Sequence, residues 1–389
     1  MPEAKKSLAI TFLLPHSGAV PIGGFKVVYE YANYMAKRGH TVSVVHPAIS
    51  LIDKPLRRLK PRLAARTIRN YLKEKMTGSF KPTSWFNVSP SVRLLVAPSL
   101  AAKYIPDGDI VVATAWETAE WVQQYPESKG KKFYLIQHLE TWSSPEERVL
   151  ATWKMPLEKI VIAQWLQRIA EDLGQTAHLI HNGLDFDRFK LVTALDNRDP
   201  YSLMLLFHGL EWKGTADGLT AFEIARRQEP KLKLTLFGFD PTPDNLPPGV
   251  EYYSNPPQDL LRGLYNQASI FLSASWSEGF SLPPAEALQC GAALVLTDIE
   301  GPAAYAVNGQ TALLSPIKDP EAMAANILRL VRDPDLRLKI ARNGHATIQE
   351  FTWERAGSAM EALFLRSLQP WGVPTESEPA HSASHSLLQ

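Results

Sequence analysis

The chain alternates short apolar runs with amphipathic segments, the pattern of parallel strands joined by helices. In the first half, apolar runs with the length and content of buried strands lie at residues 8–14, 41–45, 110–113, 133–136 and 160–163. Helices with apolar side chains every three to four residues are predicted at 25–37 and 165–173. This alternation predicts an α/β domain built on a parallel sheet.

The second half repeats the pattern after a polar stretch at 196–200 that we interpret as a linker. Strands are predicted at 203–207, 233–237, 250–253, 270–274 and 293–297, and helices at 216–227, 259–268, 320–332, 335–347 and 352–368. The sequence therefore predicts two Rossmann-like domains, 1–193 and 200–351, followed by a last helix at 352–369. Residues 370–389, rich in Ser, Pro, Glu and His, are predicted to be a disordered tail.

The most informative stretch is SWSEGFSLPPAE, residues 275–286. It joins a predicted strand to a helix that begins near Pro283 and is expected to end at Gly291. Amides at a helix N-terminus bind anions, phosphates in particular. Glu278 and Glu286 bracket this loop, and a carboxylate accepts hydrogen bonds from sugar hydroxyls. The pattern favours a ligand with phosphate and sugar parts, although the helix dipole alone also favours Glu286, and Glu278 could be an exposed loop acid.

In its context, EGFSLPPAEAL, this Glu-x7-Glu motif resembles the donor-site signature of family-4 glycosyltransferases, retaining enzymes with two Rossmann-like domains facing each other across a cleft (the GT-B architecture). The turn Asn182-Gly183-Leu184-Asp185 resembles the end-of-domain turn of the same family. The resemblance implies a nucleotide-diphosphate sugar donor and a last helix that crosses back to the first domain. Glu286 would then hold the ribose, and Glu278 the sugar, with help from amides of the loop residues Gly279, Phe280, Ser281 and Leu282.

A basic residue next to a helix N-terminus suits a phosphate site, and Lys213 stands there, before the helix predicted at 216–227. The family pattern also has an arginine directly after the glycine at the preceding strand end. Here Gly209 is followed by Leu210, which leaves Lys213 as the main basic candidate and His208 as a partial substitute. We assign Lys213 a catalytic role with Glu278 and His138, and His208 a donor-binding role.

The first domain has candidate residues at its strand ends, where open α/β sheets bind ligands. Gly23-Gly24 would let the donor approach the backbone, or would form a tight turn only. His138 follows the strand at 133–136, and the resemblance places this histidine near the donor sugar and the acceptor. The expected acceptor-side residues are Glu140 on the same loop and, after the strand at 110–113, Trp116 and Glu117.

Residues 54–75 carry nine Lys or Arg and a single acid, Glu74, with apolar residues at roughly helical intervals. Such a segment suits an anionic membrane surface or an anionic acceptor, and its alternative is a solvated positive face. The resemblance supports binding of this segment to a membrane, because many relatives glycosylate lipid-linked or membrane-proximal acceptors. We expect a cytoplasmic protein that is peripheral on the inner face of the membrane.

Several function classes are disfavoured. Asp107-Gly-Asp109 has the Asp-x-Asp spacing of metal-dependent glycosyltransferases but precedes its strand, so we interpret it as a turn and expect no metal and no cofactor. The formal net charge of +1 gives no sign of a nucleic-acid partner. Cys290 is the single cysteine, which fits a reducing compartment. No apolar stretch is long enough to span a membrane.

We therefore expect a retaining, metal-independent glycosyltransferase that moves a hexosyl or deoxyhexosyl group onto a glycan, glycolipid or other hydroxyl acceptor, in the synthesis of a surface polysaccharide or glycolipid. Two alternatives remain open. One is a catalytically degenerate protein that binds a nucleotide sugar. The other is a GT-B phosphorylase or epimerase.

Overall fold

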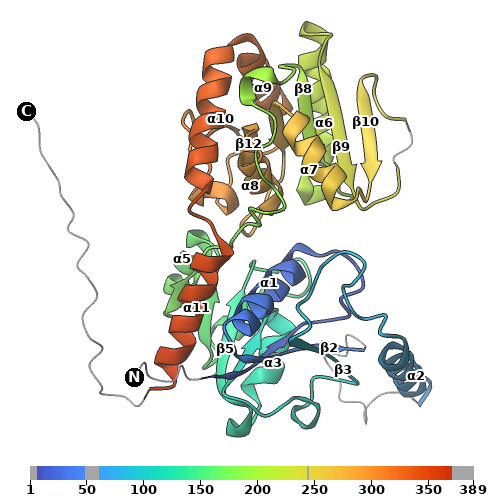
Figure 1. Ribbon diagram of the computed structural model, residues 1–389, viewed down its shortest axis with the longest axis vertical. Helices are drawn as coiled ribbons and strands as arrows, with labels where there is room; N and C mark the ends of the chain where they lie inside the picture. The colour runs from blue at the N-terminus through green and yellow to red at the C-terminus, as the bar shows by residue number, and fades with distance from the viewer. Residues whose placement is uncertain (1–6, 49–60, 243–244, 370–389) are drawn as a thin grey trace, which may run out of the picture.

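The computed structural model describes residues 7–48, 61–242 and 245–369 of the chain, and its two sheets are entirely parallel (Figure 1). The first sheet has the strand order β3-β2-β1-β4-β5-β6-β7. Its strands are β1 (Ala9–Leu13), β2 (Thr41–Pro47), β3 (Val92–Ala97), β4 (Ile110–Ala113), β5 (Lys131–Ile136), β6 (Glu158–Val161) and β7 (Ala177–Leu179).

The second sheet has the strand order β10-β9-β8-β11-β12-β13. Its strands are β8 (Ser202–Leu206), β9 (Lys233–Gly238), β10 (Val250–Ser254), β11 (Ile270–Ser273), β12 (Ala293–Thr297) and β13 (Ala312–Ser315). The central strands of both sheets are apolar and mostly buried, as expected where helices cover a parallel sheet. The prediction of an α/β protein with two Rossmann-like domains is confirmed.

Helices connect the strands, and among the described residues three more helices come after the last strand of the second sheet in the chain. In the first domain they are α1 (Gly23–Lys37), α2 (Pro61–Thr77), α3 (Trp116–Gln123), α4 (Glu146–Trp153) and α5 (Gln164–Asp172). In the second they are α6 (Thr215–Gln228), α7 (Gln258–Gln267), α8 (Leu282–Gln289), α9 (Pro320–Arg332) and α10 (Pro334–Ile348), and α11 (Trp353–Ser367) ends the described chain. The segment predicted to be a disordered tail, 370–389, lies outside the described residues.

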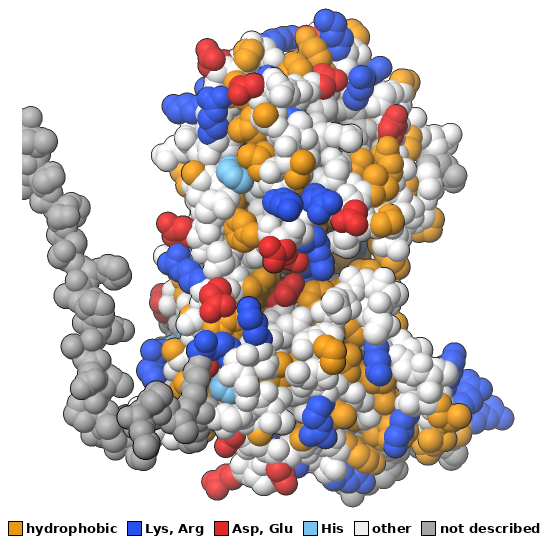
Figure 2. Space-filling model, in the orientation of Figure 1, with side chains coloured by type: hydrophobic (Ala, Val, Ile, Leu, Met, Phe, Trp, Pro, Cys, Tyr) orange, Lys and Arg blue, Asp and Glu red, His pale blue; other side chains and the backbone are white. Residues whose placement is uncertain are grey.

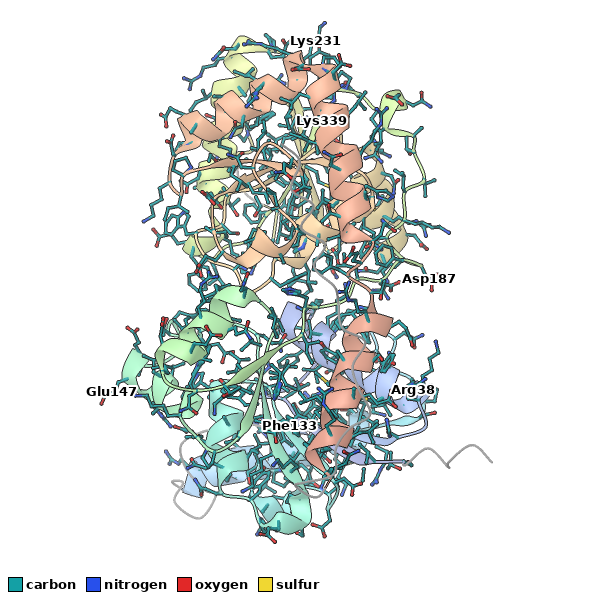
Figure 3. All side chains as sticks on the ribbon, turned by 90° about the vertical axis from the view of Figure 1, so that its left-hand side faces the viewer. Arg38, Phe133, Glu147, Asp187, Lys231 and Lys339 are labelled. Atoms are coloured by element: carbon teal, nitrogen blue, oxygen red, sulfur yellow. The ribbon has the colours of Figure 1, made fainter. Side chains whose placement is uncertain are left out.

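The last helix, α11, leaves the second domain and packs on the first, beside α1 (Figures 1 and 3). It begins at Thr352, whose hydroxyl accepts a hydrogen bond from the Arg355 amide and caps the helix. Farther along, Phe364 contacts the ring of Phe133 on β5, and Glu361 pairs with Arg38. The two domains are therefore joined by two chain crossings.

The strand order of each sheet fixes where a ligand can bind. It reverses between β1 and β4 in the first sheet and between β8 and β11 in the second. At such a reversal, the loops after the two strands diverge and open a crevice at their carboxyl ends. The loops that follow β8 and β11 carry Lys213 and Glu278, and the helices that follow β1 and β4 carry the glycines 23 and 24 and Glu117 in their first turns. The topology therefore gathers the candidate residues at the two crevices.

Candidate active site

The two crevices face each other and form one cavity of about 800 Å³ between the domains. Side chains of both domains line it, including most residues that the sequence singles out: Gly23, Gly24, Glu117, His138, Glu140, His208, Lys213, Glu278, Gly279, Phe280, Ser281, Leu282 and Glu286. Trp116 is the exception. Its ring is buried in the first domain, and its indole N–H donates to Ser143.

The start of α8 forms the wall of the cavity in the second domain. Ser281 precedes the helix in the left-handed region (φ 64°), and the prolines fall in the first turn, as predicted. Within the described part of the chain, the backbone amides of residues 279–282 have no hydrogen-bond acceptor. They and the positive end of the helix dipole are available to an anion.

The domains approach closely at Gly279. A Cβ there would overlap the carbonyl oxygen of Gln137 in the first domain, so only glycine fits. The Gly279 carbonyl accepts a hydrogen bond from Trp165 Nε1 (3.1 Å), and Gln137 Nε2 donates to the Gly24 carbonyl (3.1 Å). The glycine loops of both domains therefore meet at Gln137.

Both carboxylates of the Glu-x7-Glu motif form ion pairs. Glu278 Oε1 lies 2.8 Å from Lys213 Nζ, which belongs to the same domain. Glu286 Oε1 lies 2.8 Å from Lys26 Nζ on α1, and its other oxygen accepts a hydrogen bond from the hydroxyl of Tyr265 (3.1 Å). Sequence reasoning missed Lys26, although its place two residues after the Gly23-Gly24 pair could have pointed to it.

His138 lies between the rings of Trp142 and Trp165. Its Nδ1 accepts a hydrogen bond from the Leu139 amide (2.8 Å), so Nε2 carries the proton and donates to Ser277 Oγ (3.2 Å). Burial, and to a lesser extent the charge of Lys213, lowers its pKa to about 4. At neutral pH His138 is therefore an uncharged hydrogen-bond donor that points across the cleft.

Glu140 is the most perturbed acid of the cavity. It has a positive φ of 60°, and its carboxylate accepts a hydrogen bond from the backbone amide of Trp116 (3.0 Å). Burial raises its pKa to about 8, and the charge of Glu117 acts in the same direction. The Trp116 backbone, rather than its side chain, therefore serves the site.

The loop after β8 contains Leu210, at the position where the family pattern has an arginine. Leu210 is partly exposed, and its amide donates to His208 Nδ1 (3.1 Å), so His208 presents Nε2–H. Burial lowers the pKa of His208, followed by the charge of Lys213. The Gly209 amide donates to Asp240 Oδ2 (2.7 Å). The loop therefore presents a neutral imidazole and Lys213, and the arginine position is apolar.

Asp107 and Asp109 do not reach the cavity. Asp109 accepts a hydrogen bond from the Ala9 amide, and Asp107 pairs with Lys129. The described residues contain no group of three or more His, Cys, Asp and Glu side chains arranged to hold a metal ion.

The part of the basic segment that the structure describes forms α2, which projects from the first domain away from α11 (Figure 1). Residues 54–60 lie outside the described residues. Figure 2 shows Lys and Arg side chains next to hydrophobic ones on this projection. Ile68, Leu72 and Met76 are 51, 49 and 85% exposed. No described helix is long and apolar enough to cross a membrane.

Sequence comparison matches a family model to the second domain. Residues 193–347 match the family model "Glycosyl transferases group 1". A D-inositol 3-phosphate glycosyltransferase of Corynebacterium jeikeium is 32% identical over 125 residues, 32% of this chain and 29% of that protein. An O-antigen chain mannosyltransferase B of Escherichia coli is 31% identical over 105 residues, 27% of each chain. The chain thus matches less than a third of these relatives' length.

Solved structures match nearly the whole chain. Sucrose-phosphate synthase from Thermosynechococcus elongatus has a TM-score of 0.68 at 18% identity, covering 92% of this chain and 98% of that one. Anabaena HepE, solved in complex with UDP-glucose, has a TM-score of 0.69 at 16% identity, covering 93% and 100%. At these identities the likeness shows the GT-B fold alone. Together with the family model that matches residues 193–347 and with the curated relatives, the fold supports a glycosyltransferase.

Proposed function

We propose that the protein is a retaining glycosyltransferase that moves a hexosyl or deoxyhexosyl group from a nucleotide-diphosphate sugar to a hydroxyl acceptor. One observation carries the proposal. Glu278 and Glu286 bracket an anion-binding helix N-terminus, and all three face the first domain's glycine loop across one cavity. The matched relatives are glycosyltransferases, and HepE was solved with UDP-glucose, which supports a nucleotide-sugar donor.

In the proposed reaction, Glu286 accepts hydrogen bonds from the ribose, and Glu278 with neighbouring amides holds the sugar. Lys213 and the amides of residues 279–282 stabilise the negative charge that develops on the leaving diphosphate. The bond from C1 to the phosphate oxygen breaks as the acceptor oxygen bonds to C1 on the same face. The acceptor's proton passes to the departing phosphate oxygen, so no enzymatic nucleophile, metal or cofactor is required.

His138 and the domain contacts assist this step in the proposal. Neutral His138 donates its Nε2 hydrogen bond to a hydroxyl of the sugar or acceptor in place of Ser277. The close approach at Gly279 excludes water from C1, which limits hydrolysis of the donor. Glu140, with its raised pKa, and Glu117 lie on the acceptor side.

The acceptor side leads us to propose synthesis of a surface polysaccharide or glycolipid at the inner face of a membrane. α2 carries exposed apolar and basic side chains together, the combination that suits an anionic lipid surface. Among curated relatives, an O-antigen mannosyltransferase supports a carbohydrate acceptor. A protein so placed would be cytoplasmic and peripheral.

Thermal unfolding with UDP, GDP, ADP and dTDP tests the donor site. A nucleotide at about 100 times its Kd stabilises the native state by about 2.7 kcal/mol, a shift of several degrees in Tm. We expect one nucleotide to stabilise the wild type and the matched control Glu321→Ala, an exposed glutamate on α9, but not Glu286→Ala. If no nucleotide does so at millimolar concentration, the donor site is wrong.

Turnover separates the alternatives. Release of the stabilising nucleotide from its sugar donors, in the presence of EDTA and only with an acceptor, supports the transferase. Binding without any turnover would identify a degenerate nucleotide-sugar binder. Turnover with free phosphate, or without an acceptor, would identify a phosphorylase or epimerase. The anomeric configuration of the product tests retention.

A further inference from the structure

Each site carboxylate holds a lysine, and the two lysines come from different domains. Lys213 of the second domain pairs with Glu278, and Lys26 of the first domain pairs with Glu286. Both pairs are mostly shielded, with side chains 24 and 14% exposed in the first and 16 and 10% in the second. The two ammonium groups are therefore paired with the carboxylates that precede and follow residues 279–282 in the chain.

The charges of this arrangement cancel while the cavity holds no donor. A nucleotide-diphosphate sugar brings one negative charge on each phosphate, together with ribose and sugar hydroxyls that suit Glu286 and Glu278. When these hydroxyls donate hydrogen bonds to the carboxylates, the ammonium groups lose their partners and become available to the diphosphate. Two cations then meet two phosphate charges, while the carboxylates keep their charge and accept hydrogen bonds from the neutral hydroxyls.

We propose that Lys26 is a donor-binding residue that supplies from the first domain the positive charge absent at Leu210. The inference rests on the proposed donor site. Within the described part of the chain, the Lys and Arg side chains that line the cavity are Lys26, Arg188 and Lys213. Arg188 pairs at 3.3 Å with Asp185, which does not line the cavity and would keep this partner when a donor binds, and Lys213 is already assigned. Lys26 is the cation that remains.

The surroundings of Lys26 keep its charge available. Its ammonium lies 5.5 Å from the ring centroid of Phe189, and Glu30 follows one helical turn later on α1. Burial raises the pKa of Glu30 to about 7, so at neutral pH that carboxyl neutralises Lys26 only in part. Because Lys26 belongs to the first domain, its contact with the diphosphate requires the domains to be close. Donor binding and closure are thereby linked.

Calorimetric titration of Lys26→Gln tests the inference, using the nucleoside diphosphate that stabilises the wild type and its parent nucleoside. A charge-assisted hydrogen bond to phosphate is lost, so the diphosphate should bind about tenfold more weakly or worse. The nucleoside should bind as tightly as before, or more tightly, because Glu286 is released. Lys37→Gln, an exposed lysine of the same helix, is the matched control. Lys26→Arg should keep the affinity, and adding Leu210→Arg to Lys26→Gln should restore it.

Other results would overturn the inference. If Lys26→Gln binds the diphosphate as tightly as the wild type or more tightly, Lys26 serves only as the ion-pair partner of Glu286 and does not contact the donor. The proposed donor site is then kept. If the diphosphate and the nucleoside weaken equally, the loss is structural. Failure of Leu210→Arg to restore binding would show that the two positions are not equivalent. If the wild type binds no nucleoside diphosphate, the proposed function fails and this inference fails with it.

Discussion

Trp142 of the first domain stacks on Trp212 of the second, with ring centroids 5.8 Å apart and planes inclined by 27°. Trp142 lines the cavity and also lies against His138, and Trp212 directly precedes Lys213. The pair therefore joins the two domains next to candidate residues of both.

We expect Trp142→Ala to weaken closure. An aromatic pair contributes about 0.5–1.5 kcal/mol beyond its buried area, so the closed form should lose roughly three- to tenfold in population. The radius of gyration from small-angle scattering should rise, and donor hydrolysis relative to transfer should increase. Trp142→Phe should keep most of the population of the closed form, because it keeps an aromatic ring at this position. An unchanged scattering curve for the alanine variant would show that the stack does not hold the domains together.

Gly279→Ala should separate donor binding from transfer. The new Cβ overlaps the Gln137 carbonyl only when the domains are close, so the nucleotide should still stabilise the protein while turnover falls by about a hundredfold or more. Gly263→Ala is the matched control, because its Cβ would meet no atom within 4 Å on an ordinary helical backbone. It should be active and slightly more stable. Normal turnover of Gly279→Ala would mean that transfer does not need this approach.

Glu140 should make stability fall as the pH rises. Its pKa is about 8 in the folded protein and near its ordinary value of 4.5 in the unfolded chain, so between these pH values the folded state binds the extra proton. The free energy of unfolding therefore decreases with pH over this window. Glu140→Gln removes this contribution. The free energy of unfolding of the variant, relative to that of the wild type, should therefore rise by about 1 kcal/mol or more from pH 5 to pH 8. Urea unfolding at each pH measures it. Parallel curves would show that Glu140 is ionised throughout.

Binding to vesicles tests the role of α2. We expect the protein to float with vesicles containing phosphatidylglycerol but not with pure phosphatidylcholine, and to be released by salt. Each basic residue near an anionic surface contributes about 1 kcal/mol, so Arg69→Gln with Lys73→Gln should weaken binding by about thirtyfold. Lys231→Gln with Lys339→Gln, on the far domain (Figure 3), should not. An equal loss of vesicle binding in both double variants would mean that the overall charge of the protein, rather than α2, attracts it to the vesicles.

Elements with a clear period and end signals could be predicted from the sequence. The strand Ala293–Thr297 and the helix Pro320–Arg332 have the predicted bounds, because an apolar run and a proline after an aspartate cap define them locally. The elements that were not predicted include β3, α4, β7 and β13. β3 carries Arg93 among its apolar residues, and β7 has only three residues, so tertiary pairing rather than local pattern decides both.

The candidate residues of the cleft were identified from strand ends and one motif, but their partners were not. Glu286 has a recognisable context, whereas Lys26 lies 260 positions away and has no motif of its own. The protonation of His138 and Glu140 depends on burial in the folded protein, which no local pattern records. Pairings across a domain boundary follow from the docked fold rather than from sequence spacing.

The path of α11 has a consequence for synthesis of the protein. Its apolar face completes the core of the first domain beside α1, although the whole second sheet is made between them (Figure 1). The second domain is thus an insertion within the first, and the ribosome makes the closing helix after the whole second sheet. The first domain can reach its final packing only after the second domain has emerged, so assembly of the cleft has to wait for both domains.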